Sequence, residues 1–215
     1  MTPGTAIAGT ATVTRWWWIR HAPVTTDNGC IYGHIDLPCD VSNAAVFAGL
    51  ARLLPKEAVW ITSQLQRTKQ TAAAIGAAGL AFDKPAEEPD FAEQHFGEWQ
   101  GQNRAMIYAK HGADHGLWLA PAEFCPPGGE SFAELAARTT RGIARWSARH
   151  PGRDIVAVAH GGTIRAALGH PLALPPARAL AFETANCALT RLDYIEDAGK
   201  APAWRIGMVN LLPAL

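Results

Sequence analysis

The sequence predicts an α/β fold, a three-layer α/β/α sandwich around a mostly parallel central sheet. Three short apolar runs, at residues 15–19, 58–62 and 154–159, have the length and composition of fully buried strands. Each run is followed by a helical pattern, which is typical of parallel strands covered by helices on both faces of the sheet. We therefore expect an open sheet in which these three strands end at the same edge.

The expected helices follow these strands. The first begins at Ser42 and ends before Pro55, which cannot continue a helix. The second covers residues 64–78, is rich in Ala and ends at Gly79. Another begins at Ser131, and its apolar residues recur at helical spacing: Phe132, Leu135, Ala136, Ile143 and Trp146.

Two further segments complete the predicted fold. Residues 188–194 and 204–208 flank a turn-rich stretch and are expected to pair as an antiparallel hairpin at an edge of the sheet. Residues 94–129 contain few strand signals and many Gly, Pro, His and Trp, so we expect an insertion of short helices and loops that forms a lid over the sheet. Residues 1–13 are expected to be a flexible tail, and residues 14–215 a single domain.

Composition and charge narrow the classes of function. The chain has 19 basic and 19 acidic side chains, whereas nucleic-acid binders usually carry an excess of clustered Lys and Arg. No apolar run approaches the roughly 20 residues that cross a membrane. The 4 cysteines are scattered without a CxxC pair, which favours a reducing compartment such as the cytoplasm. We therefore expect a small-molecule partner rather than nucleic acid or a membrane.

Cationic and small residues follow the three parallel strands where each strand ends. They are Arg20, His21, Arg67, His160 and Gly161. A cluster of buried cationic groups would repel itself unless an anion lies among them. The planar fork of arginine matches phosphate oxygens, and glycine lets backbone N–H groups come close to an anion. These strand ends therefore predict a phosphate site.

A histidine in such a site can do covalent chemistry. It acts as a nucleophile through one ring nitrogen when the ring is neutral and the other nitrogen is held. Arg20 should lower the pKa of the adjacent His21, because a protonated imidazole would be a second cation beside the first. A single histidine at a strand end is more often structural than catalytic. The convergence of two histidines and two arginines favours an enzyme that forms a phosphohistidine.

Five stretches of the chain resemble motifs of the histidine phosphatase superfamily, the phosphoglycerate-mutase-like fold. They are IRHAPV, TSQLQRTKQTA, FAEQHFGEWQG, PPGGESF and VAHGGTIRA, and they occur in the family's order. The resemblance implies that His21 is the phosphorylated nucleophile and that Glu93 is the proton donor. It also implies that Arg20, Arg67 and His160 complete the phosphate pocket, and that the insertion covers the active site without a metal or other cofactor.

The chain departs from the family pattern in two places. Ala22 follows the nucleophile where the family commonly has Gly. The family also often has an Asn further on that contacts phosphate, and here the segment is one residue short, so Thr26 and Asn28 are both candidates. A separate pair, His111 and His115, has the i, i+4 spacing of a helical zinc site, but without an obvious third ligand it predicts a loop that flanks the pocket.

The motif His160-Gly161-Gly162-Thr163 resembles the phosphatase branch, because mutases of the family usually carry Asn after the second His-Gly. We therefore expect hydrolysis of a small phosphate monoester. The stretch IYGHIDLPCD resembles α-ribazole phosphatases of cobalamin synthesis, which makes α-ribazole phosphate one candidate substrate. Two alternatives stay open: a phosphoglycerate mutase-type phosphotransferase and a non-catalytic regulatory module that binds phosphate. The oligomeric state is not predicted.

Overall fold

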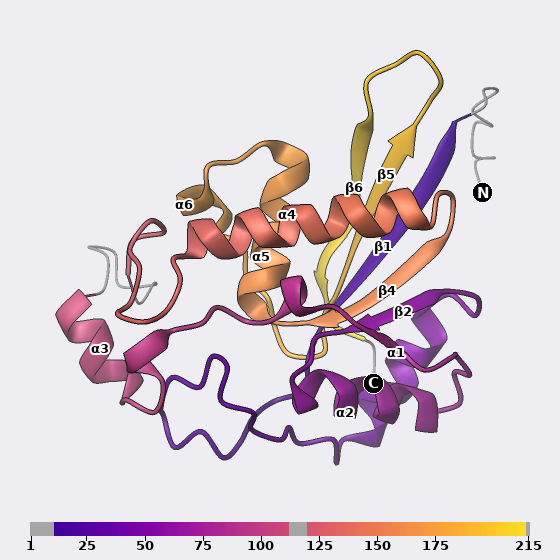
Figure 1. Ribbon diagram of the computed structural model, residues 1–215. Coiled ribbons are helices and arrows are strands. Elements are labelled where there is room, and N and C mark those ends of the chain that lie inside the picture. The colour runs from indigo at the N-terminus through magenta and orange to yellow at the C-terminus, as the bar shows by residue number, and fades with distance from the viewer. Residues whose placement is uncertain (1–10, 112–119, 214–215) are drawn as a thin grey trace.

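A six-stranded sheet forms the centre of the computed structural model, which describes residues 11–111 and 120–213 (Figure 1). The strand order is β3-β2-β4-β1-β5-β6. The four strands from β3 to β1 are parallel, whereas β5 is antiparallel to both β1 and β6. The strands are β1 (Thr12–Arg20), β2 (Val59–Thr62), β3 (Ala86–Glu87), β4 (Asp154–Ala159), β5 (Leu189–Glu196) and β6 (Ala203–Leu211). The predicted mostly parallel sheet is confirmed.

Helices cover both faces of this sheet, as predicted for a three-layer sandwich (Figure 1). Helices α1 and α2 pack in one apolar cluster against one face, and α4 and α5 pack in another against the opposite face. The α-helices are α1 (Ala44–Leu53), α2 (Gln66–Ala77), α3 (Arg104–His111), α4 (Phe132–Arg149), α5 (Gly161–Gly169) and α6 (Pro176–Ala179). Short 3-10 turns are η1 (Pro89–Phe91), η2 (Gly97–Trp99) and η3 (His170–Leu172).

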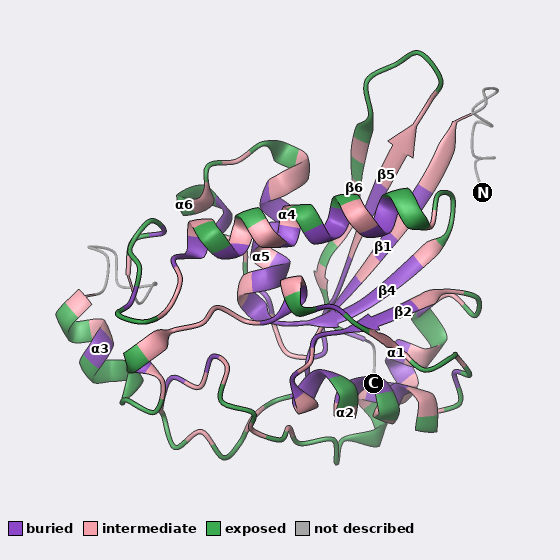
Figure 2. Cartoon of the chain, viewed as in Figure 1, coloured by how far each residue is buried: buried purple, intermediate pink, exposed green. Residues whose placement is uncertain are grey.

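The three consecutive tryptophans explain why β1 lies inside the sheet. Because side chains alternate along a strand, Trp16 and Trp18 point to one face, where their rings stack with centroids 5.1 Å apart. Phe91 packs edge-on against both rings. Trp17 points to the other face, and its indole N–H donates to Asp154 Oδ1 at 2.8 Å. Figure 2 shows β4 largely buried and β1 with buried and half-buried residues and none exposed, as expected for strands covered on both faces.

Helix α4 begins where the sequence predicts. Ser131 is its N-cap, and the Ser131 hydroxyl accepts a hydrogen bond from the Glu134 N–H at 3.1 Å. The Glu134 carboxylate in turn accepts from the Ser131 N–H at 2.7 Å, which completes a capping box. A cap of this kind typically stabilises a helix by about 1 kcal/mol. It sets the start of α4 beside α5, next to the carboxyl edge of the sheet.

Several boundaries differ from the sequence prediction. Strand β1 begins at Thr12, so residues 12–13 belong to the sheet rather than to the expected tail, because they pair with the end of β5. Residues 1–10 lie outside the described part of the chain. Helix α1 begins at Ala44, two residues after Ser42. Strand β3 was not predicted, since two residues carry no periodic signal.

The predicted hairpin at the sheet edge is confirmed, and β6 forms that edge. The described part of the expected insertion contains η2, α3 and connecting loops, and residues 112–119 lie outside it. This insertion is joined to the loop that follows β1. The Ile31 N–H donates to the Gln102 carbonyl at 2.9 Å, and the Gly101 N–H donates to the Ile31 carbonyl at 2.7 Å.

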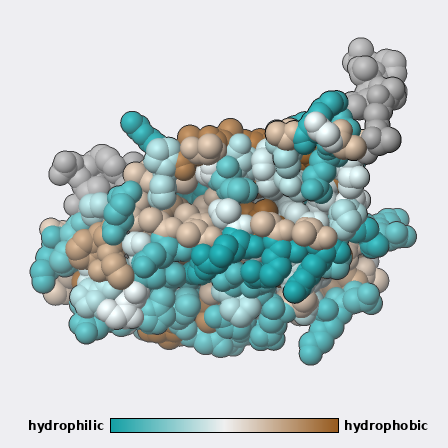
Figure 3. Space-filling model, turned by 45° about the horizontal axis from the view of Figure 1, so that its top comes forward, coloured by the Kyte–Doolittle hydropathy of each residue, from teal (hydrophilic) through white to brown (hydrophobic). Residues whose placement is uncertain are grey.

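In the face drawn in Figure 3, apolar residues form separate patches on a largely hydrophilic background. The two most exposed large apolar side chains in the described ranges are Met106 and Leu212, at 73% and 61%. Within residues 11–111 and 120–213, no helix combines the length and apolar character that a bilayer crossing requires.

Candidate active site

The carboxyl ends of the three parallel strands bring the predicted side chains together. His21 follows β1, His160 follows β4, and Arg67 lies in the first turn of α2, after β2. All three side chains are fully buried, and the rings of His21 and His160 have centroids 5.2 Å apart. The expected convergence at one sheet edge is therefore observed.

The imidazole of His21 is held in one orientation. Its Nδ1 lies 2.7 Å from the Ala22 carbonyl oxygen. Because a carbonyl oxygen only accepts hydrogen bonds, Nδ1 must carry the proton, and the neutral ring has its lone pair on Nε2. Nε2 is buried and has no hydrogen-bond partner within the described ranges. The backbone around the ring is fixed as well, because Asn186 Nδ2 donates to the His21 carbonyl at 2.7 Å.

The surroundings of both histidines keep them neutral. Burial, with a further contribution from the Arg67 charge, lowers the pKa of His21 to about 3, although the hydrogen bond to Ala22 opposes this shift. Burial and then Arg67 likewise hold the pKa of His160 well below its ordinary value of 6.5. Two neutral rings therefore lie beside a buried guanidinium. This supports the sequence-based expectation that His21 is available as a nucleophile.

These depressed pKa values predict that the fold loses stability in mild acid. As the pH falls below 6.5, an unfolded chain binds a proton on His21, whereas the folded chain does not until about pH 3. The free energy of unfolding should therefore fall by about 1.4 kcal/mol per pH unit for each such histidine. Urea titrations at several pH values between 7 and 5 give the slope of the free energy of unfolding against pH. In a His21→Asn variant this slope should be smaller than in the wild type by the contribution of one bound proton. An unchanged slope would contradict the burial of a neutral His21.

Arg67 is positioned by the loop that follows β1. Its Nη2 donates to the Gly33 carbonyl at 2.7 Å and its Nη1 to the Ile35 carbonyl at 3.2 Å. Its Nε donates to His160 Nδ1 at 3.3 Å, and the guanidinium lies over the ring of Tyr32, 5.0 Å from the centroid. These hydrogen bonds go to neutral acceptors. The positive charge of Arg67 is therefore held beside His21 and His160 without being cancelled by these acceptors.

His160 differs from His21 in how its ring nitrogens are used. Nδ1 accepts the hydrogen bond from Arg67, so the proton is on Nε2, which lies 2.8 Å from Ser63 Oγ. The lone pair of this ring is therefore occupied. His160 therefore supports Arg67, and of the two rings only His21 presents an unengaged nitrogen within the described ranges.

Arg20 and the start of α5 form another side of the pocket. Arg20 Nη1 donates to the Thr184 carbonyl at 2.5 Å. Arg20 Nε is buried and has no partner within the described ranges. A Cβ on Gly161 would lie 3.4 Å from Arg20 Nε and 3.3 Å from Thr184 Oγ1. Gly161 therefore keeps space open at the amino end of α5, where unpaired N–H groups favour an anion.

Glu93 lies on the loop that follows η1, and both its backbone and its carboxylate are fixed. Its carbonyl accepts from His34 Nε2 at 2.6 Å and from Arg138 Nη2 at 2.9 Å. Its Oε1 accepts from the N–H groups of Gly162 and Gln94, at 3.1 and 3.0 Å. Because Oε1 already accepts two hydrogen bonds, a proton on this carboxyl group belongs on Oε2. The carboxyl group of Glu93 is thus hydrogen-bonded to the amino end of α5.

The close approach of Glu93 to Gly162 makes a substitution there informative. A Cβ on residue 162 would lie 2.5 Å from Glu93 Oε1. The Glu93 side chain can move away at little cost in stability, so Gly162→Ala should change the free energy of unfolding by less than about 1 kcal/mol. Displacement of the carboxyl group should nevertheless slow turnover of an alkyl phosphate by about 10–100-fold. This loss is a fraction of the rate enhancement that general acid catalysis usually provides.

A matched control for this substitution is available in α2. A Cβ on Gly76 would lie 3.4 Å from the ring of Phe82, which is ordinary van der Waals contact. Gly76→Ala should therefore leave turnover unchanged. Full activity in Gly162→Ala, with the variant folded, would show that the position of Glu93 does not matter to the reaction.

The structure does not place Thr26 or Asn28 in the pocket. Both are exposed, and Asn28 lies in a turn with a left-handed φ of 51°. Asp27 between them lines the cavity instead, and its carboxylate pairs with Arg104 at 3.0 Å. The expectation that Asn28 contacts phosphate is therefore not supported, because the shortened loop turns that side chain outward. Ala22 is not among the residues with positive φ, so its methyl group introduces no backbone strain.

Asn186 is a pocket residue that the sequence reasoning did not identify. It lines the same cavity as Arg20 and holds the backbone of His21. It precedes β5, whose amino end lies beside the carboxyl end of β1 because the two strands are antiparallel. The predicted hairpin could therefore have identified Asn186 as a pocket residue, if its first strand had been placed next to β1 in the sheet.

The expected loop histidines do not form a described metal site. His111 stacks on Trp99 with centroids 4.9 Å apart, and His115 lies outside the described residues. Among residues 11–111 and 120–213, no group of three or more His, Cys, Asp or Glu side chains is arranged to hold a metal ion.

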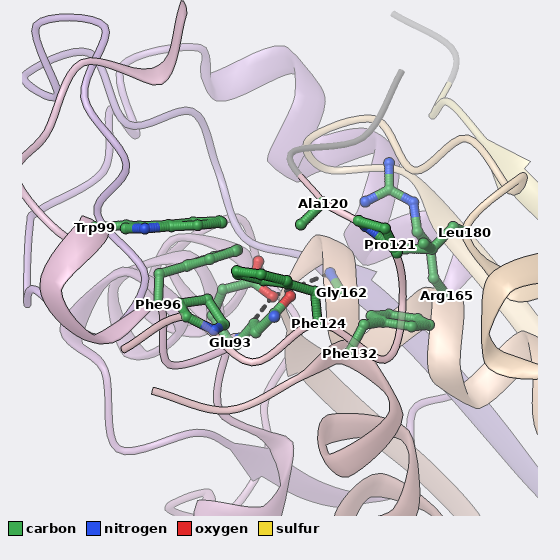
Figure 4. Close-up of a pocket in the computed structure, with 12 residues that line it drawn as sticks. Glu93, Phe96, Trp99, Ala120, Pro121, Phe124, Phe132, Gly162, Arg165 and Leu180 are labelled. Carbon is green, nitrogen blue, oxygen red and sulfur yellow. Dashed lines mark hydrogen bonds between the residues drawn. The ribbon is translucent and has the colours of Figure 1, made fainter. Parts of the chain in front are cut away.

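Two adjoining cavities meet at Glu93 and Phe96. The phosphate lobe, about 330 Å³, is lined by residues that include Arg20, Asp27, Tyr32, Arg104 and Asn186. The aromatic lobe, about 200 Å³, is drawn in Figure 4. It is lined mainly by apolar side chains, and its polar side chains are Glu93, Gln94 and Arg165. His21 is fully buried and does not itself line the phosphate lobe, whereas Arg20, its neighbour in sequence, does.

Curated proteins with related sequences include both mutases and phosphatases. The chain is 33% identical over 144 residues to 2,3-bisphosphoglycerate-dependent phosphoglycerate mutase 2 of Gloeobacter violaceus, a match that covers 65% of this chain and 66% of that protein. It is 35% identical over 126 residues to glucosyl-3-phosphoglycerate phosphatase of Mycobacterium tuberculosis, covering 54% and 55% of the two chains. The chain thus spans less than two thirds of the length of these relatives.

Solved structures share the fold over nearly the whole chain. The complex of mycobacterial glucosyl-3-phosphoglycerate phosphatase with VO3 matches with a TM-score of 0.74 and 28% identity, covering 92% of this chain and 98% of that one. The Escherichia coli structure described as a putative α-ribazole-5'-P phosphatase matches with a TM-score of 0.73. Its 22% identity, over 94% of this chain and 99% of that one, supports a shared fold alone.

A family model supplies the remaining comparison. It is the model of the histidine phosphatase superfamily (branch 1), and it matches residues 16–207. That range includes every strand end described above and most of β6. The chain therefore belongs to the histidine phosphatase superfamily, as its sequence motifs predicted.

Proposed function

We propose that this protein hydrolyses a small phosphate monoester through a phosphohistidine formed on His21. The observation that carries this proposal is the state of the His21 ring. It is neutral, its Nδ1 is held by the Ala22 carbonyl, and its Nε2 has no hydrogen-bond partner in the described structure. Two arginines beside the ring provide positive charge for phosphate oxygens.

In the first step, the lone pair of His21 Nε2 attacks phosphorus while the bond from phosphorus to the alcohol oxygen breaks. Glu93 Oε2 gives its proton to the departing oxygen. Charge on the phosphoryl oxygens is stabilised by Arg20 and Arg67 and by the amino end of α5. The phosphorylated imidazole is cationic, and its Nδ1–H remains hydrogen-bonded to the Ala22 carbonyl, which stabilises the intermediate.

In the second step, water attacks the phosphohistidine. The Glu93 carboxylate takes a proton from the water, the bond between nitrogen and phosphorus breaks, and inorganic phosphate leaves. His21 returns to its neutral form with the proton on Nδ1, and Glu93 returns to its acid form. The same carboxyl group therefore acts first as an acid and then as a base.

The choice of substrate is the finer part of the proposal. The stretch IYGHIDLPCD supports α-ribazole phosphate as a candidate. Sequence relatives bear the names glucosyl-3-phosphoglycerate phosphatase and metal-independent phosphoserine phosphatase, so their substrates are further candidates. A panel of these three phosphate esters, assayed in excess EDTA, should identify the preferred class. Activity should persist in the chelator, because side chains supply the positive charge of the pocket.

The intermediate itself provides the direct test. The enzyme is mixed for milliseconds with a radiolabelled phosphate ester and quenched in base, and the label is then located by peptide mapping. We expect an acid-labile, base-stable phosphate on His21. Label on another residue would move the nucleophile elsewhere. Label that passes to an added alcohol and not to water would favour a phosphotransferase, and an absence of both label and turnover would favour a module that only binds phosphate.

A further inference from the structure

We infer that the aromatic lobe is the subsite for the leaving group, and that it selects phosphate monoesters whose alcohol carries a flat aromatic ring. This inference rests on the proposed function, because it places the two ends of the ester relative to the group that protonates the oxygen between them. It specifies the class of alcohol in the substrate, and it gives the aromatic side chains of this lobe, which take no part in the chemistry at His21, a role in binding that alcohol.

The position of Glu93 divides the cavity into two functional parts. Arg20 and Asn186, which adjoin His21, line the phosphate lobe and not the aromatic lobe. Glu93 lines both lobes, and its Oε1 is held by Gly162 at the start of α5. If Glu93 protonates the bridging oxygen while phosphorus lies beside Arg20, the carbon attached to that oxygen continues on the other side of Glu93. That side is the aromatic lobe.

The walls of this lobe are suited to a flat apolar ring. Trp99 and Phe124 are nearly parallel, with an interplanar angle of 18° and centroids 5.4 Å apart. This spacing leaves no room for a third ring between them, so the pair forms one continuous surface. Figure 4 shows Trp99 and Phe96 on one side of the lobe and Phe132 on the other. Trp99 and Phe132 are themselves buried, at 5% and 3% exposed, so a ring that enters the lobe would pack mainly against Phe124 and the half-buried Phe96.

A sugar would be a poorer occupant of the same space. Each hydroxyl that leaves water needs a hydrogen-bond partner, and an unpaired one weakens binding. The polar side chains of the lobe are few, and Arg165 already donates from Nε to the Phe182 carbonyl at 2.8 Å. Phe124, by contrast, is 37% exposed, so part of its ring has apolar surface that a ligand can cover.

The test compares two esters whose alkoxides both leave poorly, benzyl phosphate and ethyl phosphate. Wild-type kcat/KM should be about 10–100-fold higher for benzyl phosphate, because burial of a ring adds that much to transition-state binding. Phe124→Ala should lower kcat/KM for benzyl phosphate by about tenfold, and the ratio between the two esters should fall accordingly. Phe124→Leu keeps apolar bulk without a flat face and should recover only part of the loss.

A control on the same insertion is Met106→Ala, since Met106 is 73% exposed and lines neither lobe. It should leave the ratio of the two esters as in the wild type. Equal kcat/KM values for the two esters, or a ratio unchanged by Phe124→Ala, would overturn the subsite while leaving the phosphatase proposal intact. A complete lack of turnover of both esters, together with no trapped phosphohistidine, would instead overturn the proposed function.

Discussion

Replacement of His21 by Ala is expected to reduce turnover of any phosphate ester by at least about 10⁴-fold, because removal of a covalent nucleophile leaves only binding and electrostatic catalysis. No neighbouring ring can substitute for it. The lone pair of His160 accepts a hydrogen bond from Arg67, and its other nitrogen is engaged with Ser63. The variant should also form no acid-labile phosphoenzyme in the rapid-quench experiment.

A suitable control is His170→Ala. His170 lies in η3, where its ring packs edge-on against Trp204 at the far side of α5. This variant should retain both turnover and label. Circular dichroism and urea titration of the two variants separate loss of chemistry from loss of fold. A folded His21→Ala enzyme that still turns over an alkyl phosphate would remove His21 from the nucleophile role.

Replacement of Glu93 by Gln should have an effect that depends on the leaving group. An alkoxide leaves poorly without a proton, so turnover of an alkyl phosphate should fall by about 10²–10⁴-fold, or roughly 3–5 kcal/mol. A nitrophenolate leaves readily unprotonated, so the first step on that ester should change far less. The Gln side-chain oxygen can still accept the hydrogen bonds from the Gly162 and Gln94 N–H groups. The substitution therefore removes the proton donor and keeps the side chain in place.

Pre-steady-state kinetics make this prediction decisive. In Glu93→Gln, water attack on the phosphohistidine loses its base, so nitrophenol should appear in a burst that is followed by slow turnover. The burst rate reports the first step on the aromatic ester, and single-turnover kinetics report it on the alkyl ester. Equal losses in the first step on both esters would exclude Glu93 as the acid, and His95 or Glu98 would be the next residues to test.

The residues at the strand ends were predictable because chain direction alone decides where parallel strands finish. Once the runs ending before His21 and His160 are read as parallel strands, both histidines must lie at one edge of the sheet. Arg67 follows for the same reason, since it opens the helix after β2. Periodicity and the direction of the chain are sufficient to place these three.

Other parts of the site depend on loop conformation, which has no periodic signal. Glu93 was located only through the family motif, because its position is set by hydrogen bonds to its carbonyl from His34 and Arg138, far away in the sequence. Two consecutive left-handed residues in a short loop, Asn28 and Gly29, set the outward turn of Asn28 and the inward position of Asp27. No propensity distinguishes these two neighbours in advance.

Among residues 11–111 and 120–213, no carboxylate accepts a hydrogen bond from Arg67, which has a thermodynamic consequence for the whole molecule. The guanidinium is fully buried, and burial lowers its pKa, so the folded state carries a desolvated charge that neutral acceptors only partly stabilise. A tetrahedral anion that binds there contributes to folding as well as to catalysis. At 100 times its dissociation constant, vanadate or phosphate should add about 2.7 kcal/mol to the free energy of unfolding. The melting temperature of this protein should therefore rise with anion concentration, and Arg67→Met should weaken that dependence, because Arg20 and the amino end of α5 remain.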